Sequence, residues 1–143
     1  MSTDNIKKHI KQDHTFHISK AKRNERFYNK INFSDSFFNE WGIVTLFYSS
    51  VHYVDAVLSQ DSSLPDNLRD PMDHHNRNSA ISKCTALLPI ASKYLQLSEY
   101  SRDARYNQTF FEEGILNNIK TNLFDPIQIH IRNYLGISLE SDS

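Results

Sequence analysis

Apolar side chains recur along the chain at the three- and four-residue spacing of helices, and few residues interrupt the pattern. The 143 residues include only three glycines and four prolines, too few for the many turns of an all-β fold. The spacing predicts four or five helices: residues 16–31, 37–60, from 74 or 76 past 86, 90–100 (continued or reopened at Pro89), and 111–134. The sequence therefore predicts an all-α fold, an antiparallel bundle of four to five helices.

The connections and ends follow from turn residues. Residues 32–36 are predicted to be a loop, with Ser34 or Ser36 capping the next helix, and residues 61–73 are predicted to be a loop with two prolines. Pro126 should kink or break the last helix, and Gly136 should end it. A chain of this length fits one domain, so we expect a single bundle over 1–143, with 1–15 a basic arm and 137–143 a polar tail.

Charge and cysteine content narrow the class of protein. The net charge is −1, yet residues 1–31 hold eight of the sixteen Lys and Arg against three acidic residues. Such a segment is either a phosphate-binding surface or a solvated helix face.

Cys84 is the single cysteine, which excludes an intrachain disulfide and fits a small core residue. No apolar run reaches the roughly 18 residues of a membrane span, and we expect a cytoplasmic protein.

The predicted second helix carries an unusual polar line. Ile43, Phe47, Val51, Val54 and Leu58 form one apolar stripe, while Tyr48, His52 and Asp55 follow another at spacings of four and three. Because the helix has few hydrophilic positions, we expect it to be central and His52 to be at least half buried. A buried imidazole needs a partner, so His52 is either a satisfied structural residue or part of a functional site.

A second polar cluster follows the proline-containing loop. Asp73 to Asn78 stands at the predicted start of the third helix, where backbone amides and the helix dipole favour an anion. His74 and Arg77 are three residues apart and would share a helix face. Arg77 could hold a phosphate through two parallel bonds while His74 moves a proton. Alternatively, Asp73 merely caps the helix and the histidines are exposed.

Three segments together resemble the HEPN superfamily of small helical bundles. The W-x5-F-Y-x3-H pattern runs from Trp41 to His52, an H-x2-R-N pattern starts at His74, and Tyr94-Leu95 is followed by S-R-x-A-R-Y over residues 101–106. The resemblance spans about residues 17–136. It implies a bundle that often dimerises, in a family rich in RNA-cleaving members that act without metal.

In such nucleases an arginine and a histidine of an R-x4-6-H motif meet across a dimer cleft. Here Arg69 and His74 satisfy that spacing across the proline-containing loop, while Arg105 and Arg132 have no histidine at the required distance. The resemblance therefore points to an RNA- or nucleotide-binding protein, with a metal-independent ribonuclease of a defence or toxin–antitoxin system as its enzymatic form. The predicted catalytic residues are His52, His74 and Arg77, and the predicted substrate-binding residues are Tyr48, Asp55, Asn78, Arg69 and Arg105.

Two alternatives remain. The chain is either a non-catalytic interaction module that pairs with itself, or a helical bundle that binds a metal through inward-facing histidines and carboxylates. The metal ligands would come from His14 and His17, or from His52, His74, Asp55 and Asp73. No Glu-x-x-His string is present, and we predict no cofactor. The expected partners are a second copy, RNA or a nucleotide, and a cognate antitoxin or other partner protein, with no membrane.

Overall fold

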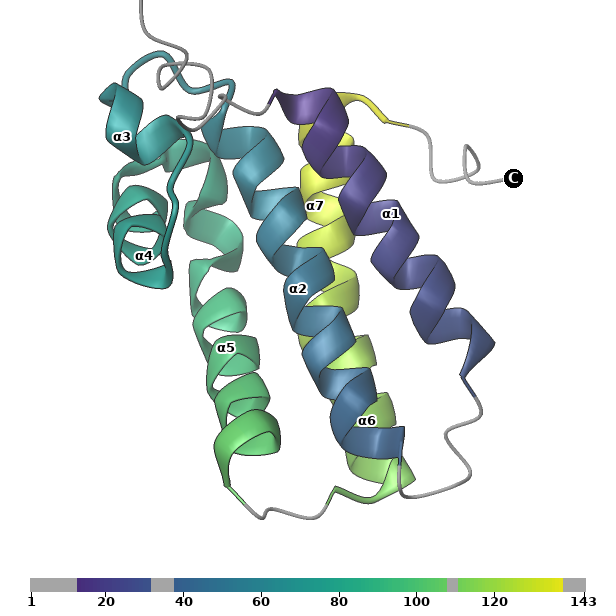
Figure 1. Cartoon of the computed structure of the whole chain (residues 1–143). Coiled ribbons are helices and arrows are strands. Elements are labelled where there is room, and N and C mark those ends of the chain that lie inside the picture. The colour runs from purple at the N-terminus through teal and green to yellow at the C-terminus, as the bar shows by residue number, and fades with distance from the viewer. Residues whose placement is uncertain (1–12, 32–37, 108–110, 138–143) are drawn as a thin grey trace, which may run out of the picture.

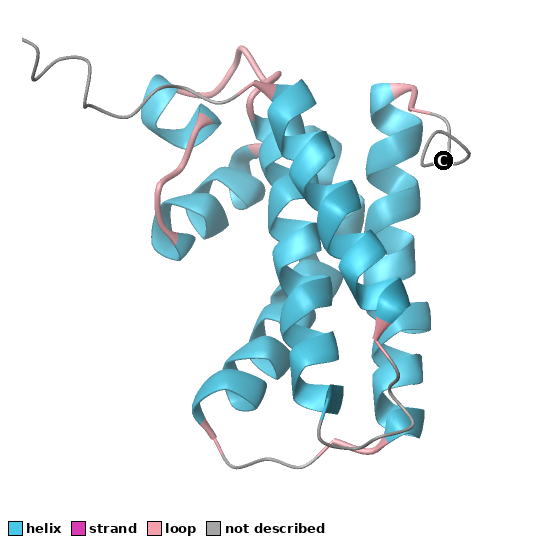
Figure 2. Ribbon diagram, turned by 45° about the vertical axis from the view of Figure 1, so that its right-hand side comes forward, coloured by secondary structure: helices cyan, strands magenta, loops and turns pink. Residues whose placement is uncertain are grey.

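The computed structural model describes residues 13–31, 38–107 and 111–137, and every regular element within them is a helix (Figures 1 and 2). The prediction of an all-α bundle is confirmed. Three of the predicted features lie outside the described residues: the loop at 32–36 with its caps Ser34 and Ser36, most of the basic arm and most of the polar tail. The elements are α1 (His14–Lys30), α2 (Asn39–Leu58), α3 (Asp66–Arg69), α4 (His74–Lys83), the 3₁₀ segment η3 (Thr85–Ile90), α5 (Ala91–Tyr106), α6 (Glu113–Ile119), the π-helical segment η4 (Lys120–Phe124) and α7 (Asp125–Leu135).

The long helices alternate in direction, and α2 lies at the centre. In Figure 1, α1 descends, α2 rises beside it, α5 descends, and the run from α6 to α7 rises behind α2. Among the described elements, α2 packs against every other helix and helical segment. Because α2 is surrounded in this way, most of its buried polar side chains depend on protein groups for hydrogen bonds.

The apolar stripe predicted on α2 forms the middle of the core. Ile43, Phe47, Val54 and Leu58 have no exposed surface, and Val51 is almost completely buried. Burying side chains of this size contributes about 1.5–3 kcal/mol each relative to exposure. This packing fixes the rotation of α2 and thereby the directions in which its polar line points.

The chain between α2 and α5 differs from the prediction. A four-residue helix, α3, occupies part of the stretch predicted as loop, and the next helix ends at Lys83 rather than beyond Ala86. The chain then continues as η3, with Pro89 inside it, before α5 begins at Ala91. Proline removes one backbone donor, which a short 3₁₀ stretch tolerates better than a long α-helix. Buried Cys84 lies between α4 and η3, as predicted for a small core residue.

The last helical run shows how Pro126 is accommodated. The prediction was a kink or break, and the structure has five π-helical residues, η4, immediately before α7, in which Pro126 occupies the first turn. Proline is tolerated in a first turn because the amide there has no intrahelical acceptor. Gly136 ends α7 in the left-handed conformation with φ +70°, as predicted, which an L side chain rarely adopts.

Two aspartates set the starts of the helices that flank α2. Asp13 accepts a hydrogen bond from the amide of Phe16 at 2.9 Å, and Asp73 accepts one from the amide of Asn76 at 2.8 Å. The capping role predicted for Asp73 is confirmed, and it makes His74 the first residue of α4. Across the described residues, none of these helices combines the length and apolar character needed to cross a membrane.

Candidate functional site

The polar line of α2 divides between its neighbours rather than pointing into one cleft. Tyr48 contacts α5, His52 contacts α1, and Asp55 contacts α4. Successive residues of a helix are rotated by about 100°, so spacings of four and three keep the three side chains on one side but not in one direction. Each contact therefore forms its own part of the site.

The Asp55–Arg77 ion pair is the buried centre of the cluster. Arg77 donates from Nε to one Asp55 oxygen at 2.7 Å and from Nη2 to the other at 2.9 Å. Nη2 also reaches the carbonyl of Pro71 at 3.3 Å. Although burial alone would lower it, the bonds to Asp55 raise the pKa of Arg77. The guanidinium is thus committed to a carboxylate, and the two-bond grip on phosphate predicted for Arg77 is occupied by Asp55.

Arg77 also orients His74. The two side chains share a face of α4, as predicted, and Arg77 Nη1 lies 3.4 Å from His74 Nδ1. Because a guanidinium only donates, Nδ1 accepts in this contact and the proton of the neutral ring lies on Nε2. Burial lowers the pKa of His74, and the nearby Arg77 and Arg105 act in the same direction. His74 therefore presents an Nε2–H donor at neutral pH while remaining largely exposed.

Tyr48 and Arg105 complete the surface beside His74. Arg105 donates from Nη1 to the Tyr48 hydroxyl at 2.7 Å and from Nε to the carbonyl of Ser101 at 3.3 Å. The ring centroids of Tyr48 and His74 are 6.3 Å apart. We call Tyr48, His74 and Arg105, which come from α2, α4 and α5, the anion face. Its only formal charge at neutral pH is the positive charge of Arg105.

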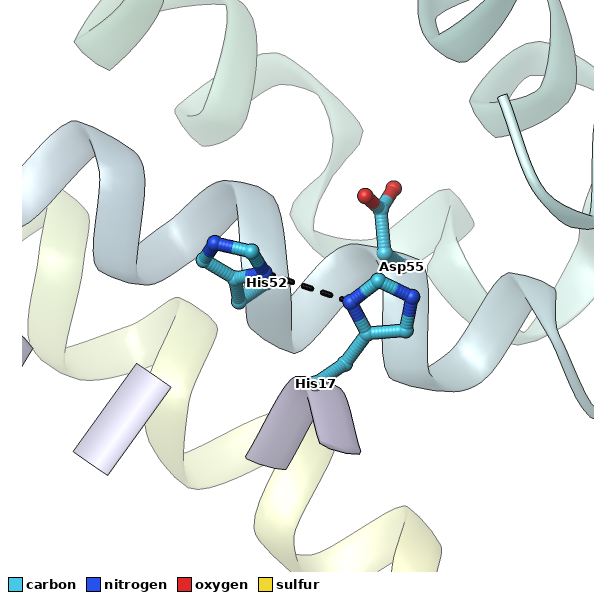
Figure 3. A group of neighbouring side chains, drawn as sticks. All are labelled: His17, His52 and Asp55. Atoms are coloured by element: carbon cyan, nitrogen blue, oxygen red, sulfur yellow. Dashed lines mark hydrogen bonds between the residues drawn. The ribbon is translucent and has the colours of Figure 1, made fainter. Parts of the chain in front are cut away.

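His52 lies outside the anion face and pairs with a residue of α1. The Nδ1 atoms of His52 and His17 are 3.2 Å apart (Figure 3). Within the described residues, no hydrogen bond or ring contact joins His52 to His74 or Arg77. The structure thus brings His74 and Arg77 together but gives His52 a separate neighbourhood.

Burial controls the charge of this imidazole pair. It lowers the pKa of His52 to about 4, with His17 and Arg77 acting in the same direction. Burial also lowers the pKa of His17, against the opposing effect of Asp55 and Asp70. Both rings are therefore neutral at pH 7, and a single proton between the facing Nδ1 atoms satisfies the contact.

The remaining predicted substrate-binding residues are not part of this arrangement. Arg69 lies on α3 and pairs with Asp66 of the same short helix. Asn78 is exposed on α4, one residue beyond Arg77. Two residues outside the predicted catalytic and substrate-binding sets belong with the cluster: His17, which the sequence offered only as a metal ligand beside His14, and Tyr106. The Tyr106 ring stacks with Arg105 at 5.1 Å and is 75% exposed.

A second buried arginine lies on another side of α2. Arg132 of α7, fully buried, donates from Nε to the Tyr53 hydroxyl at 3.1 Å and lies 3.4 Å from Glu25 of α1. Tyr53 and Gln128 both donate to the same Glu25 carboxylate. These contacts tie α1, α2 and α7 together.

Comparison with protein-family models, with curated proteins and with solved structures finds no match to this chain.

Proposed function

We propose that this protein binds the phosphate groups of RNA or of a nucleotide at the anion face, as a relative of the HEPN superfamily. The observation that carries the proposal is the meeting of Arg105, His74 and Tyr48 from three helices at one partly exposed place. The resemblance of residues 41–52, 74–78 and 101–106 to that superfamily falls on the same three helices.

Arg105 supplies the charge. Its Nη1 and Nε have protein acceptors, whereas Nη2 has no hydrogen-bond partner among the described residues. A guanidinium held by two contacts loses less conformational freedom when it binds a phosphate oxygen. Its position over the Tyr48 and Phe47 rings, 5.6 and 5.8 Å from their centroids, restrains it further. Arg105 is thus a preorganised cation at the surface.

His74 and Tyr106 add recognition of other kinds. The Nε2–H of His74 is a donor suited to a second phosphate oxygen, and Arg77 fixes the orientation of the ring through Nδ1. The exposed Tyr106 ring beside Arg105 is suited to stacking with a base, which contributes about 1–3 kcal/mol per base in single-strand binding proteins. A phosphate donor set next to an exposed aromatic ring favours a single-stranded nucleic acid or a nucleotide over a simple anion.

In this proposal the basic residues of α1 do not contact the bound ligand and attract it only through long-range electrostatics. Lys20, Arg23 and Arg26 lie on α1, which is on the opposite side of α2 from α5 in Figure 1. Surface charges raise the rate at which an anionic ligand arrives, and salt screens this effect over about 8 Å at physiological ionic strength. We therefore expect these residues to change association rates more than the contacts of the bound state.

Binding is tested with a matched pair of charge-removing variants on one helix. Fluorescence anisotropy with a labelled single-stranded RNA of mixed sequence should give about tenfold weaker binding for Arg105→Gln, the loss of one phosphate contact of about 1.4 kcal/mol. Arg102→Gln removes the same charge from an exposed position three residues earlier and should retain nearly native affinity. Equal losses in both variants, or no binding by the native protein, would refute the proposal.

Cleavage is tested separately, in EDTA, with the native protein and the variants His74→Gln and His52→Gln. If the anion face is catalytic, His74 acts as acid or base and Arg105 stabilises the phosphate, so His74→Gln should lose cleavage by about 100-fold or more. His52→Gln should cleave normally, because His52 lies outside the face. Binding without cleavage by any of the three proteins would leave the binding proposal intact and remove the ribonuclease hypothesis.

A further inference from the structure

We propose that His17, His52 and Asp55 bind one divalent transition-metal ion of the zinc class on the α1 side of α2. Within the described residues these three side chains offer one ligand atom each, and the three atoms all lie within 4.8 Å of one another (Figure 3). The site is separate from the anion face and does not depend on the function proposed for it. It also differs from the metal sets considered in the sequence, because His17 takes the place of His74 and Asp73.

The two imidazoles already have the spacing of metal ligands. A tetrahedral ion with ligand bonds of about 2.0–2.1 Å places its ligand atoms about 3.3 Å apart. The facing Nδ1 atoms of His17 and His52 are 3.2 Å apart. The separation of the two nitrogens therefore already suits one ion, and each ring has to turn until its lone pair points at the ion instead of at the other nitrogen. Neutral imidazole is the form that binds metal, and both rings are neutral at pH 7.

Asp55 supplies the third ligand while it keeps Arg77. A carboxylate has about four lone-pair positions on its two oxygens, and Arg77 occupies one on each. Each oxygen therefore keeps a lone pair that Arg77 does not use and that can coordinate an ion. Two imidazoles and one carboxylate leave at least one coordination position for water or an anion, as in catalytic rather than structural zinc sites.

The outer shell of the site contains a carboxylate where metal sites usually have one. Histidines that bind metal through one nitrogen commonly donate from the other to a carboxylate. His17 is 4% exposed, and its Nε2 has no hydrogen-bond partner among the residues that the structure describes and lies 3.9 Å from an Asp70 oxygen. The Asp70 carboxylate thus lies close to the nitrogen that would donate in a metal-bound His17 ring.

The charges near the site are compatible with a cation. Asp55 and Asp70 attract it, while Arg77 and Lys20 oppose it. Asp55 and Arg77 offset each other's charge, so the net attraction comes from Asp70, and Lys20, which opposes it, is only partly buried. Imidazole ligands favour Zn²⁺, Co²⁺ and Ni²⁺ over the oxygen-preferring Mg²⁺ and Ca²⁺, which sets the expected selectivity.

The test uses the full chain without a histidine tag and titrates it with Co²⁺, whose visible absorption reports coordination. We expect one equivalent to bind with a spectrum of low coordination number and to be displaced by Zn²⁺ but not by Mg²⁺. His52→Gln should weaken metal binding by at least about tenfold, because even the loss of an outer-shell hydrogen-bond partner of a ligand lowers metal affinity by about that much. His75→Gln and His14→Gln are the matched controls, because both histidines lie outside the three-residue group, and these variants should bind Co²⁺ normally.

A second measurement needs no variant and so does not depend on how the variants fold. In long-range ¹H–¹⁵N spectra of the native protein, Zn²⁺ should shift both Nδ1 resonances of His17 and His52 to the metal-bound range and leave those of His75 unchanged. Failure of Zn²⁺ or Co²⁺ to bind at millimolar concentration would overturn the proposal. Binding that His75→Gln or His14→Gln abolishes, with the His17 and His52 resonances unmoved, would overturn it as well.

Discussion

The two buried arginines of the bundle, Arg77 and Arg132, resemble each other in chemistry and differ in what surrounds them. Each is paired with a carboxylate next to α2: Arg77 with Asp55 and Arg132 with Glu25. Around Arg132, the contacts within the described residues include a tyrosine hydroxyl and the carboxylate that Gln128 also contacts. Around Arg77, the contacts continue to His74, which is exposed at the surface.

By this difference Arg132–Glu25 is a structural ion pair and Arg77–Asp55 is a candidate functional one. A buried ion pair is weak support for function or for stability, because desolvation offsets much of the attraction. The Arg132 network is closed by protein groups, so its effect should be on folding. The Arg77 pair positions a histidine of the anion face and a carboxylate beside the imidazole pair, so its effect should extend to binding.

The largest effect is expected when the pair with the more deeply buried carboxylate is broken: the Asp55 side chain is 5% exposed and that of Glu25 13%. Arg77→Met leaves Asp55 buried without its counter-charge, which should lower the free energy of unfolding by about 3–5 kcal/mol in urea denaturation. The double variant Arg77→Met, Asp55→Leu should recover much of the loss, because it removes both charges. A single variant as stable as the native protein would show that the pair is not ionised in the fold.

Breaking the closed network should cost less. Arg132→Met leaves Glu25 with the hydroxyl of Tyr53 and the amide of Gln128, so we expect a loss of about 2–3 kcal/mol in the free energy of unfolding. RNA affinity at a temperature where the variant is folded should be unchanged. A variant that folds normally but loses RNA binding would contradict the separation of the two networks.

Acid should lower the free energy of unfolding in part through the protonation of His52. The pKa of His52 is lowered by burial to about 4, below the ordinary value of 6.5, so the folded state resists protonation. Its contribution to stability is fully present above pH 6.5 and is lost as the pH falls from 6.5 toward 4. In metal-free buffer, His52→Gln should flatten the dependence of the unfolding free energy on pH in that window by about 1–3 kcal/mol. An unchanged pH profile would mean that His52 titrates normally.

The smallest effect on folding is expected at the anion face. Arg105 is partly exposed and its bond to Tyr48 lies near solvent, so Arg105→Gln should change the free energy of unfolding by less than about 1 kcal/mol. Its effect should fall on RNA affinity instead. A loss of stability as large as that of Arg132→Met would place Arg105 among the structural arginines.

The sequence predicts the local features of this site well. Helical spacing is sufficient to identify the buried stripe of α2 and the shared face of His74 and Arg77. The cap at Asp73 follows from its residue type. Each of these features depends on residues within one or two turns. The partner of Arg77 could not be predicted in the same way. Asp55 was expected to bind substrate, and only the packing of α4 against α2 brings it to Arg77.

The contacts that the sequence missed join distant elements. His17 lies 35 residues before His52, and the apolar spacing of α1 does not indicate which residue of α2 His17 meets. The short helix α3 was missed because four residues carry no periodic signal, and the π-helical segment because Pro126 predicts a break as readily as an adjustment. Whether His52 can share a metal ion with His17 therefore depends on how α1 packs against α2, which the sequence does not predict.

The anion face is tested most directly by following arginine and histidine side chains while the native protein is titrated with a short single-stranded RNA. In ¹H–¹⁵N spectra, the Nε–H of Arg105 and the Nε2–H of His74 should shift in proportion to the bound fraction. The Nε–H of buried Arg132 serves as the internal control and should not move. Shifts at Arg105 and His74 alone are the predicted result; unmoved Arg105 and His74 signals at saturating RNA would contradict the account.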